Sequence, residues 1–244
     1  MFQPRSGWGA PTCIAVVGAA GASGASTTAV ALAAACNRTE ATWLLDLVPA
    51  SGMELLIGAE TQPGLRWREL DRTRGEINAQ QLAAECPAYG DMPTVLGGRE
   101  ETGPPNDTAA CSIIASLCAQ GNVVVADVDK SALLRLHDLW THVVVVSPLT
   151  LQGLANTHQL VRYLASTSIE IKVVASMLVS PDLTITQFEK SLGIPISGYL
   201  PILRSIRPAI IHGLGPLGAG PRTTRKLLDF AHHLADRIST HEPA

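Results

Sequence analysis

One segment near the N-terminus, IAVVGAAGASGASTTAVALAAA at residues 14–35, constrains the fold more than any other part of the chain. It opens with a short apolar run, continues through closely spaced glycines and ends in an alanine-rich stretch. That order predicts a buried strand, a tight turn and a helix. Close glycines bring backbone N–H groups near a ligand and a helix N-terminus favours negative charge, so the pattern indicates a phosphate-binding loop. A helix capped by Ser26 or Thr27 after a tight turn is the simpler alternative.

The same segment shares two features with a secretion signal. Residues 6–37 carry no charge, and Arg5 precedes an apolar run. Glycine and hydroxyl residues interrupt that run, however, where a signal peptide has an unbroken apolar block. Large aliphatic residues are also too few for a membrane span. We therefore expect neither a signal peptide nor a membrane span.

The rest of the chain alternates short β-branched runs with helical patterns, which indicates a parallel sheet covered by helices on both faces. The sequence predicts strands at residues 13–17, 42–46, 94–96, 123–127, 142–147, 171–176 and 197–200. It predicts helices at residues 26–36, 107–119, 149–165, 185–192 and 223–239. Residues 87–105, rich in Gly, Pro and acidic side chains, are expected to form a surface loop around the short third strand.

The organisation is that of one domain, because 244 residues fall within the usual size of a single domain and no linker or repeat divides them. We expect a flexible lead at residues 1–11, one domain at residues 12–239 and a tail at residues 240–244. Only 16% of the residues are charged, against roughly 25% in ordinary soluble domains. That shortage indicates extensive burial on both faces of the sheet, or a sizeable contact surface.

Charge and cysteine content exclude several classes of function. With a net charge of −3, nothing in the overall charge attracts nucleic acid. Five cysteines without a CxxC pair fit neither a disulfide framework nor a zinc site, so we expect a cytoplasmic protein with reduced thiols. The seven histidines show no metal-binding spacing.

Two nucleotide-binding motifs fit the glycine loop. In the first, residues 24–27 take the place of the Gly-Lys-Ser/Thr end of a P-loop, with Ala25 at the position of the lysine that contacts the β- and γ-phosphates. No lysine occurs before Lys130. Because lysine offsets the charge of the triphosphate, its absence argues against strong ATP binding and against hydrolysis.

The second motif is the dinucleotide-binding pattern. Gly18, Gly21 and Gly24 form GxxGxxG, and Asp46 follows 22 residues after Gly24, near the position of a ribose-binding acid. The glycine spacing alone leaves both motifs open.

The residues after the loop resemble one protein family. GASTTAVALAAA is similar to the altered P-loop of the CpaE/TadZ branch of the MinD/ParA superfamily, in which Gly-Ala-Ser-Thr replaces Gly-Lys-Thr-Thr. The resemblance continues through LLDLVPASGMELLIGAETQPGLRWREL, which is similar to an actinobacterial CpaE-like group also described as septum-site-determining proteins. It extends through VVVADV and VVVVSPLTLQGLANTHQLVRYL, and covers about residues 12–238. It implies a three-layer, P-loop NTPase-like (Rossmann-like) α/β fold with a mostly parallel sheet.

This resemblance also implies a nucleotide site with a metal-binding corner. The implied nucleotide-binding residues are Gly21, Ala22, Ser23, Gly24, Ala25, Ser26, Thr27, Asp46 and Asp127. Ser26 and Asp127, the latter at the Walker B position, would hold Mg²⁺ if ATP or ADP binds. A residue that ends a strand and caps the next helix is an equally good interpretation of Asp127.

The implied site departs from the family pattern at four points. Ala20 and Ala25 replace both lysines, Val48 replaces the second acidic residue after strand two, and no adenine-reading Asn is evident near Ser176. The lysines offset phosphate charge, and the missing carboxylate positions metal and attacking water. The resemblance therefore implies a degenerate site and a pseudo-ATPase without catalytic residues, in which any enzyme activity would be ATP hydrolysis.

The function that the resemblance implies is spatial. The protein would act as a positioning or scaffold protein for a Tad-type pilus or secretion apparatus, or for the division septum. It would form a homodimer in the cytoplasm, recruited by pilus, secretion or division proteins to the pole, the septum or the inner membrane face. The alternatives are a weak Mg²⁺-dependent ATPase switch and an NAD(P)-binding Rossmann protein. The sequence leaves open whether Lys130 or a lysine of a second subunit restores charge to the site.

Two charged clusters lie outside the loop. The first contains Arg66, Arg68, Arg72 and Arg74 together with Glu69, Asp71 and Glu76. Its charges nearly cancel, which predicts a solvated helix and turn, with a partner surface centred on Trp67 as the alternative.

The second cluster is the one locally basic region, Arg204, Arg207, Arg222, Arg225 and Lys226. ParA proteins hold DNA with basic residues late in the chain, but the acidic net charge leads us to expect no DNA binding. The last helix places Leu227, Ala231, Leu234 and Ile238 on one stripe, which predicts core packing.

Overall fold

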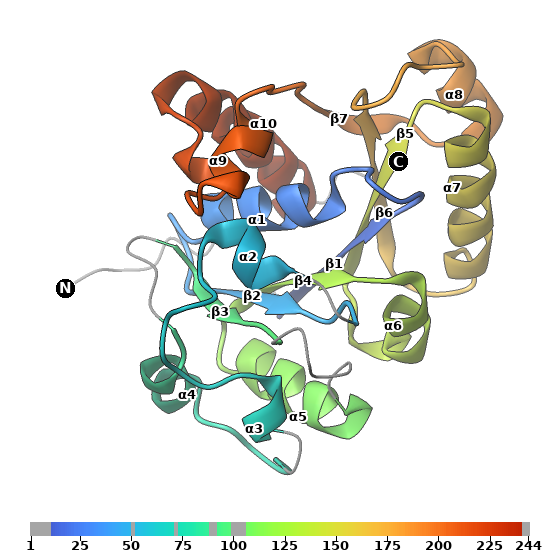
Figure 1. Ribbon diagram of the computed structural model, residues 1–244. Helices are drawn as coiled ribbons and strands as arrows, with labels where there is room; N and C mark the ends of the chain where they lie inside the picture. Colours follow the sequence, from blue (N-terminus) through green and yellow to red (C-terminus); the bar gives the residue numbers. More distant parts are fainter. Residues whose placement is uncertain (1–10, 50–51, 71–72, 88–91, 99–105, 241–244) are drawn as a thin grey trace.

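Seven parallel strands form the centre of the molecule in a computed structural model that describes residues 11–49, 52–70, 73–87, 92–98 and 106–240 (Figure 1). They are β1 (Thr12–Gly18), β2 (Thr42–Asp46), β3 (Thr94–Leu96), β4 (Val123–Val128), β5 (His142–Pro148), β6 (Glu170–Ser176) and β7 (Ile196–Leu200). Their spatial order is β3-β2-β4-β1-β5-β6-β7, and every neighbouring pair is parallel. The connections that leave the carboxyl ends of β1, β2 and β4 therefore meet at one edge of the sheet.

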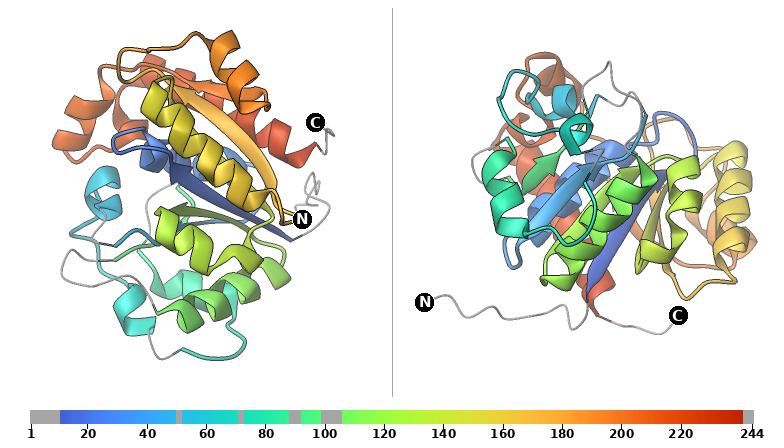
Figure 2. Two further views of the ribbon diagram at one scale, coloured as in Figure 1. Left: turned by 90° about the vertical axis from the view of Figure 1, so that its right-hand side faces the viewer. Right: turned by 90° about the horizontal axis from the view of Figure 1, so that it is seen from below.

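Helices cover both faces of this sheet, which gives three layers (Figure 2). One face packs against α1 (Ala25–Cys36) and α10 (Pro221–Ser239). The other face packs against α4 (Ala79–Glu85), α5 (Asp107–Ala119), α6 (Lys130–Arg135) and α7 (Leu151–Leu164). α8 (Ile185–Leu192) joins α7 in a third apolar cluster against β6 and β7. The predicted α/β class with a parallel sheet between two helical layers is confirmed.

Residue chemistry explains the layers. β1, β4 and β5 are mostly apolar, and they are buried on both sides. α1 buries Ala29, Ala31 and Ala33, which alternate with Val30 and Leu32 and let the helix lie close against the sheet. α10 buries the stripe of Leu227, Ala231, Leu234 and Ile238, so the predicted packing of the last helix is confirmed.

All seven predicted strands and all five predicted helices are present, with bounds that differ by no more than two residues. The helix predicted in the charged cluster is α3 (Trp67–Leu70), whereas the sequence missed the short helices α2 (Met53–Ile57), α4, α6 and α9 (Ile206–Ile211). Each contains seven residues or fewer, which is too short for a helical period to be read. α4 and α6 begin at the capping side chains of Asn78 and Asp129, which accept from Gln81 N and Ala132 N.

The prediction of a solvated charged cluster is wrong for Arg66, whereas Arg68, Glu69, Arg74 and Glu76 are exposed as predicted. Arg66 and Trp67 are each only 2% exposed, and Arg66 forms an ion pair with the buried carboxylate of Glu54. Its guanidinium also donates to the carbonyls of Gly64 and Gln62, each at 2.8 Å. The ion pair and these hydrogen bonds compensate the buried charge of Arg66. The sequence-based prediction had assumed that the charges of the cluster would be balanced by their neighbours in water. Because Trp67 is buried, it does not form the centre of an exposed partner surface.

Parts of some predictions lie outside the described residues. They are most of the lead at residues 1–11, the tail beyond Thr240, Asp71 and Arg72 of the charged cluster, and residues 88–91 and 99–105 of the predicted surface loop.

Candidate functional site

The loop from Gly18 to Gly24 follows the central strand β1 and turns sharply into α1. Two of its residues have positive φ, Ala22 at 56° and Gly24 at 91°. No side chain caps α1 at Gly24, and Thr28 N donates to Gly24 O at 2.9 Å as the helix begins. The N–H groups of residues 25–27 precede the first bond within the helix. They therefore form the kind of helix N-terminus that accepts phosphate.

Close packing surrounds two of the three glycines of this loop, Gly18 and Gly24. A Cβ atom at Gly18 would lie 2.6 Å from the Ser23 hydroxyl oxygen. A Cβ atom at Gly24 would collide with Leu200 and lie 3.1 Å from Leu178 Cδ1. A Cβ atom at Gly21 would meet nothing within 4 Å, so Gly21 faces open space. The loop is thus held from the side of β6 and β7 and is open on the other side.

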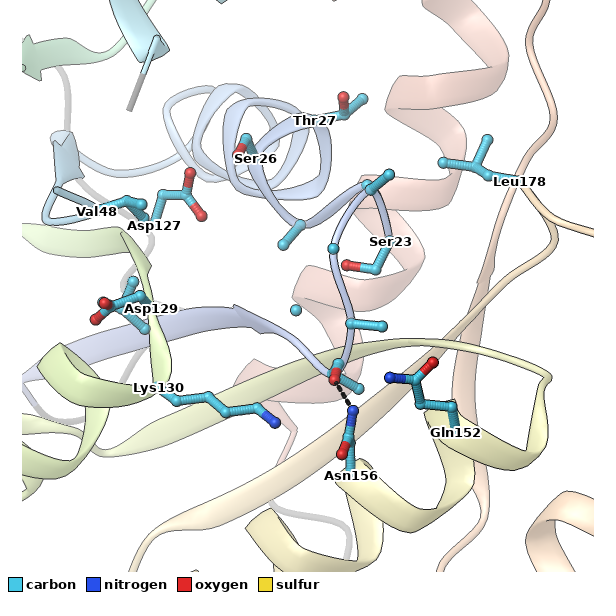
Figure 3. Close-up of a pocket in the computed structure, with 18 residues that line it drawn as sticks. Ser23, Ser26, Thr27, Val48, Asp127, Asp129, Lys130, Gln152, Asn156 and Leu178 are labelled. Atoms are coloured by element: carbon cyan, nitrogen blue, oxygen red, sulfur yellow. Dashed lines mark hydrogen bonds between the residues drawn. The ribbon is translucent and has the colours of Figure 1, made fainter. Parts of the chain in front are cut away.

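A cavity of about 810 Å³ opens beside the loop. Figure 3 shows the side chains that line it, from connections that follow several strands. They come from residues 18–27, from Val48 after β2, from residues 127–130 after β4, from Gln152 and Asn156 of α7, and from Leu178 after β6. Of the predicted site residues, Gly21, Ala22, Ser23, Gly24, Ala25, Ser26, Thr27 and Asp127 all line this cavity.

Asp127 is the buried carboxylate of the cavity, only 2% exposed. Its pKa is raised to about 7, mainly by burial and also by the negative charge of Asp46, although a hydrogen bond from Ser26 lowers it. Among the described residues, its Oδ2 atom has no hydrogen-bond partner. An unpaired carboxylate oxygen beside a hydroxyl and the glycine loop fits a hydrated Mg²⁺ ion, because Mg²⁺ prefers oxygen ligands and keeps several waters. The residues present therefore fit a Mg²⁺-nucleotide.

Asp46, the remaining predicted residue, lies behind the cavity wall. It is buried at the end of β2 and is the register partner of Asp127 across the β2–β4 pair. Its Oδ1 accepts a hydrogen bond from Val48 N at 3.2 Å, and its carbonyl accepts from Trp67 Nε1 at 2.7 Å. Val48, not Asp46, contributes a side chain to the cavity lining. Asp46 acts on the site through its charge and by shaping the turn that carries Val48.

The strand order argues against the dinucleotide motif. In a Rossmann dinucleotide site, the glycine-rich strand and the strand ending in the ribose-binding acid are neighbours. Here β4 lies between β1 and β2, so a whole strand separates the glycine loop from Asp46. The P-loop interpretation requires no such adjacency.

The lining residues that the sequence did not single out include Gln152, Asn156 and Leu178. Asn156 Nδ2 donates to the carbonyl of Ala19 at 2.8 Å, which ties α7 to the start of the glycine loop. No local sequence signal marks that contact, because the two residues are 137 positions apart. Lys130, which the sequence left open, also lines the cavity.

Outside this cavity, the described part of the chain offers little other site chemistry. It contains no group of three His, Cys, Asp or Glu side chains that could hold a metal ion. None of its helices has both the length and the apolar character that a bilayer-crossing helix requires.

Comparison with known sequences finds two uncharacterized proteins of Mycobacterium tuberculosis, from the CDC 1551 and H37Rv strains. Each is 31% identical to this chain over 229 residues, a match that covers 90% of this chain and 57% of the relative. The chain thus spans little more than half the length of the curated relatives it matches. No protein-family profile matches the sequence.

Comparison with solved structures is more informative about the fold. A ParA family ATPase from Chlorobium tepidum has a TM-score of 0.77 at 16% identity, covering 92% of this chain and 99% of that one. MinD from the Aquifex aeolicus MinC:MinD cell division complex has a TM-score of 0.74 at 12% identity, covering 96% and 98%. The septum site-determining protein MinD of Pyrococcus horikoshii, complexed with Mg-ADP, has a TM-score of 0.67 at 13% identity, covering 93% and 95%. This chain has the fold of the ParA and MinD ATPases.

Proposed function

We propose that this chain is a MinD/ParA superfamily protein of the CpaE/TadZ-like branch that binds Mg²⁺-ATP or Mg²⁺-ADP without efficient hydrolysis and acts as a positioning scaffold. The observation that carries the proposal is the composition of the cavity. A backbone phosphate loop and the unpartnered Oδ2 of Asp127 are present among the described residues, whereas alanine and valine occupy the positions that hydrolysis needs.

The binding half of the proposal rests on the loop and its neighbours. Backbone N–H groups of residues 21–27 would surround the phosphates, as at other helix N-termini that follow glycine-rich turns. The Ser26 hydroxyl and the Asp127 carboxylate would hold Mg²⁺ or its water ligands. Mg²⁺, when bound, would offset phosphate charge beside the buried carboxylate. The Mg-ADP complex of the P. horikoshii structure supports this choice of ligand.

The argument against turnover rests on what the lining lacks. Ala20 and Ala25 offer methyl groups where a P-loop lysine would stabilise the charge that develops on the phosphoryl group. Val48 offers an apolar side chain where the resemblance implies the carboxylate that positions water. Loss of such electrostatic contacts costs orders of magnitude in rate while leaving backbone contacts to the ground state intact.

The spatial role is the finer part of the proposal. The structures with this fold include a MinC:MinD cell division protein complex and a septum site-determining protein, and these names support a role in directing the place of another assembly. We place the protein in the cytoplasm as a homodimer, recruited through pilus, secretion or division proteins to the pole, the septum or the inner membrane face. We assign it to a Tad-type pilus or secretion apparatus or to the septum because of the CpaE/TadZ-like sequence from Ile14 to Leu70.

Equilibrium binding tests the proposal directly. We expect purified protein to bind ATP and ADP more tightly with Mg²⁺ than without, to ignore NAD, and to release phosphate far more slowly than ParA and MinD ATPases. Asp127→Ala should abolish the Mg²⁺ effect, and Asp229→Ala, an exposed residue of α10, should not. Light scattering with and without nucleotide should show a dimer. Absence of nucleotide binding would refute the proposal.

The retained Ser26 and Asp127 favour one second candidate, a weak Mg²⁺-dependent ATPase switch. It predicts steady phosphate release that is lost in Asp127→Ala, together with a dimer that forms only with ATP. The same assays separate the two candidates.

A further inference from the structure

The proposed nucleotide site has a charge deficit. A nucleoside triphosphate brings several negative charges, and Asp127 adds another at the metal corner. Mg²⁺ and backbone dipoles offset part of this charge, but P-loops also place an ammonium group at the β- and γ-phosphates. Among the described residues that line the cavity, Lys130 is the single Lys, Arg or His.

Strand pairing brings Lys130 beside the loop. β4 is the parallel neighbour of β1, with Val128 in register with Val17. The chain that leaves β4 therefore emerges next to the chain that leaves β1. Lys130 is the second residue after β4 and the first of α6, and Gly18 is the last of β1. Two segments far apart in sequence thus share one wall of the cavity.

The cap of α6 separates Lys130 from its acidic neighbour. Asp129 is the N-cap residue, and its Oδ1 accepts from Ala132 N at 2.6 Å, which turns the carboxylate into its own helix. Figure 3 shows the Lys130 side chain extended in the other direction, with its ammonium group towards the glycine loop and Asn156. The side chain thus reaches into the cavity rather than folding back onto Asp129.

The ammonium group is also available. No hydrogen bond or ion pair joins Lys130 to any residue in the described ranges, whereas Lys172 pairs with Glu170. The side chain is half-buried and lines the cavity, and its ammonium group points towards the glycine loop (Figure 3). A compact, mobile point charge of this kind suits a phosphate, which needs no fixed fork of donors.

We infer that Lys130 is the phosphate-binding lysine of this site, relocated from the glycine loop to the start of α6. The inference rests on the proposed nucleotide-binding function and extends it. The ligand class is a nucleoside di- or triphosphate, contacted at its terminal phosphates. The loop supplies backbone donors from one side, and Lys130 supplies charge from the neighbouring strand.

Calorimetric titration of the full chain with Mg²⁺-ATP, Mg²⁺-ADP and AMP tests the inference. Lys130→Met should weaken Mg²⁺-ATP binding about ten- to a hundredfold, the usual loss for a charged hydrogen bond. AMP, which lacks the terminal phosphates, should lose far less affinity. Lys130→Arg should keep part of the affinity. Lys226→Met, an exposed lysine of α10 outside the cavity, should bind as the parent chain does. Unchanged thermal midpoints should show that each variant is folded.

A rescue variant separates local charge from local structure. Ala25→Lys in the Lys130→Met background returns a lysine to the loop and should recover Mg²⁺-ATP affinity. If Lys130→Met binds Mg²⁺-ATP as tightly as the parent chain, or loses AMP and ATP affinity equally, the inference is wrong and the proposed function stands. If the parent chain binds no nucleotide, the proposed function fails and the inference fails with it.

Discussion

Asp46 and Asp127 lie side by side in register at the ends of two adjacent parallel strands, β2 and β4, and both are buried. Burial and the charge of Asp46 together raise the pKa of Asp127 to about 7, despite a hydrogen bond from Ser26 that lowers it. In the absence of a cation, the site therefore holds one carboxylate that resists ionisation. Binding of Mg²⁺ would reverse that preference, because a divalent cation stabilises the ionised form.

Substituting Asp127 should change how stability depends on pH. The folded pKa lies above the value of 3.8 for an unperturbed side chain, so between these values the folded state binds more protons than the unfolded state. The free energy of unfolding should therefore fall as pH rises from about 4 to about 7. Asp127→Asn removes this loss and should be more stable than the parent chain at about pH 8, by on the order of a few kcal/mol. Urea unfolding in the absence of Mg²⁺ and nucleotide, at a series of pH values, measures this difference in stability.

A control exists in the neighbouring carboxylate. Asp46→Asn removes the charge that raises the Asp127 pKa, so it should move the pH-dependent loss of stability to lower pH without abolishing it. Equal pH profiles for the parent chain and Asp127→Asn would show that Asp127 ionises normally.

The buried ion pair between Arg66 and Glu54 makes a second prediction. Breaking one partner leaves the other charged and buried, so Arg66→Met and Glu54→Leu should each cost about 3–5 kcal/mol of stability. The double variant should cost clearly less than the sum, because no uncompensated charge is left. A double-mutant cycle by urea unfolding measures the coupling. Arg68→Met, at an exposed position two residues from Arg66, should change stability by no more than about 0.5 kcal/mol.

The glycine loop offers a matched pair of substitutions. Gly24→Ala forces an alanine into φ 91° and against Leu200, which should cost about 1–3 kcal/mol. Gly21→Ala meets nothing within 4 Å and should leave stability unchanged. Thermal and urea unfolding compare the two. A Gly21→Ala variant as unstable as Gly24→Ala would contradict the geometry described for the loop.

The contact between Asn156 and Ala19 should affect the order of the loop. Asn156→Ala removes the 2.8 Å hydrogen bond and should cost about 1 kcal/mol, with faster amide exchange at residues 19–24. Gln152→Ala lies one turn earlier on α7 and makes no hydrogen bond to a described residue, so it should leave loop exchange unchanged. Hydrogen exchange followed by mass spectrometry resolves the two variants.

The strands and long helices could be predicted because each of them has a clear local sequence pattern. Strands such as β1 and β5 are mostly apolar, and long helices such as α5 match the predicted bounds. The position of β4 between β1 and β2 could not be predicted, since strand order depends on packing between distant segments. That order decides between the two motifs that the glycine spacing left open.

The sequence predicts the cavity-lining residues that lie in one local motif, but not the contacts between residues that are distant in the chain. Residues 21–27 and Asp127 follow strand ends that the sequence marks plainly, and all of them line the cavity. The burial of Arg66 depends on Glu54, twelve positions earlier, and charge counting cannot show that pairing. The direction of Lys130 depends on how Asp129 caps α6, a side-chain choice that composition does not encode.

Leu200 ends β7 and is 3% exposed, and it touches the glycine loop from behind at Gly24 without lining the cavity. A genetic screen for lost nucleotide binding would therefore recover substitutions at Leu200, far along the chain from the loop. Enlarging that side chain would push on the loop backbone that we propose to contact phosphate. The phenotype alone would suggest that Leu200 contacts the ligand, although its side chain supports the loop from the opposite side.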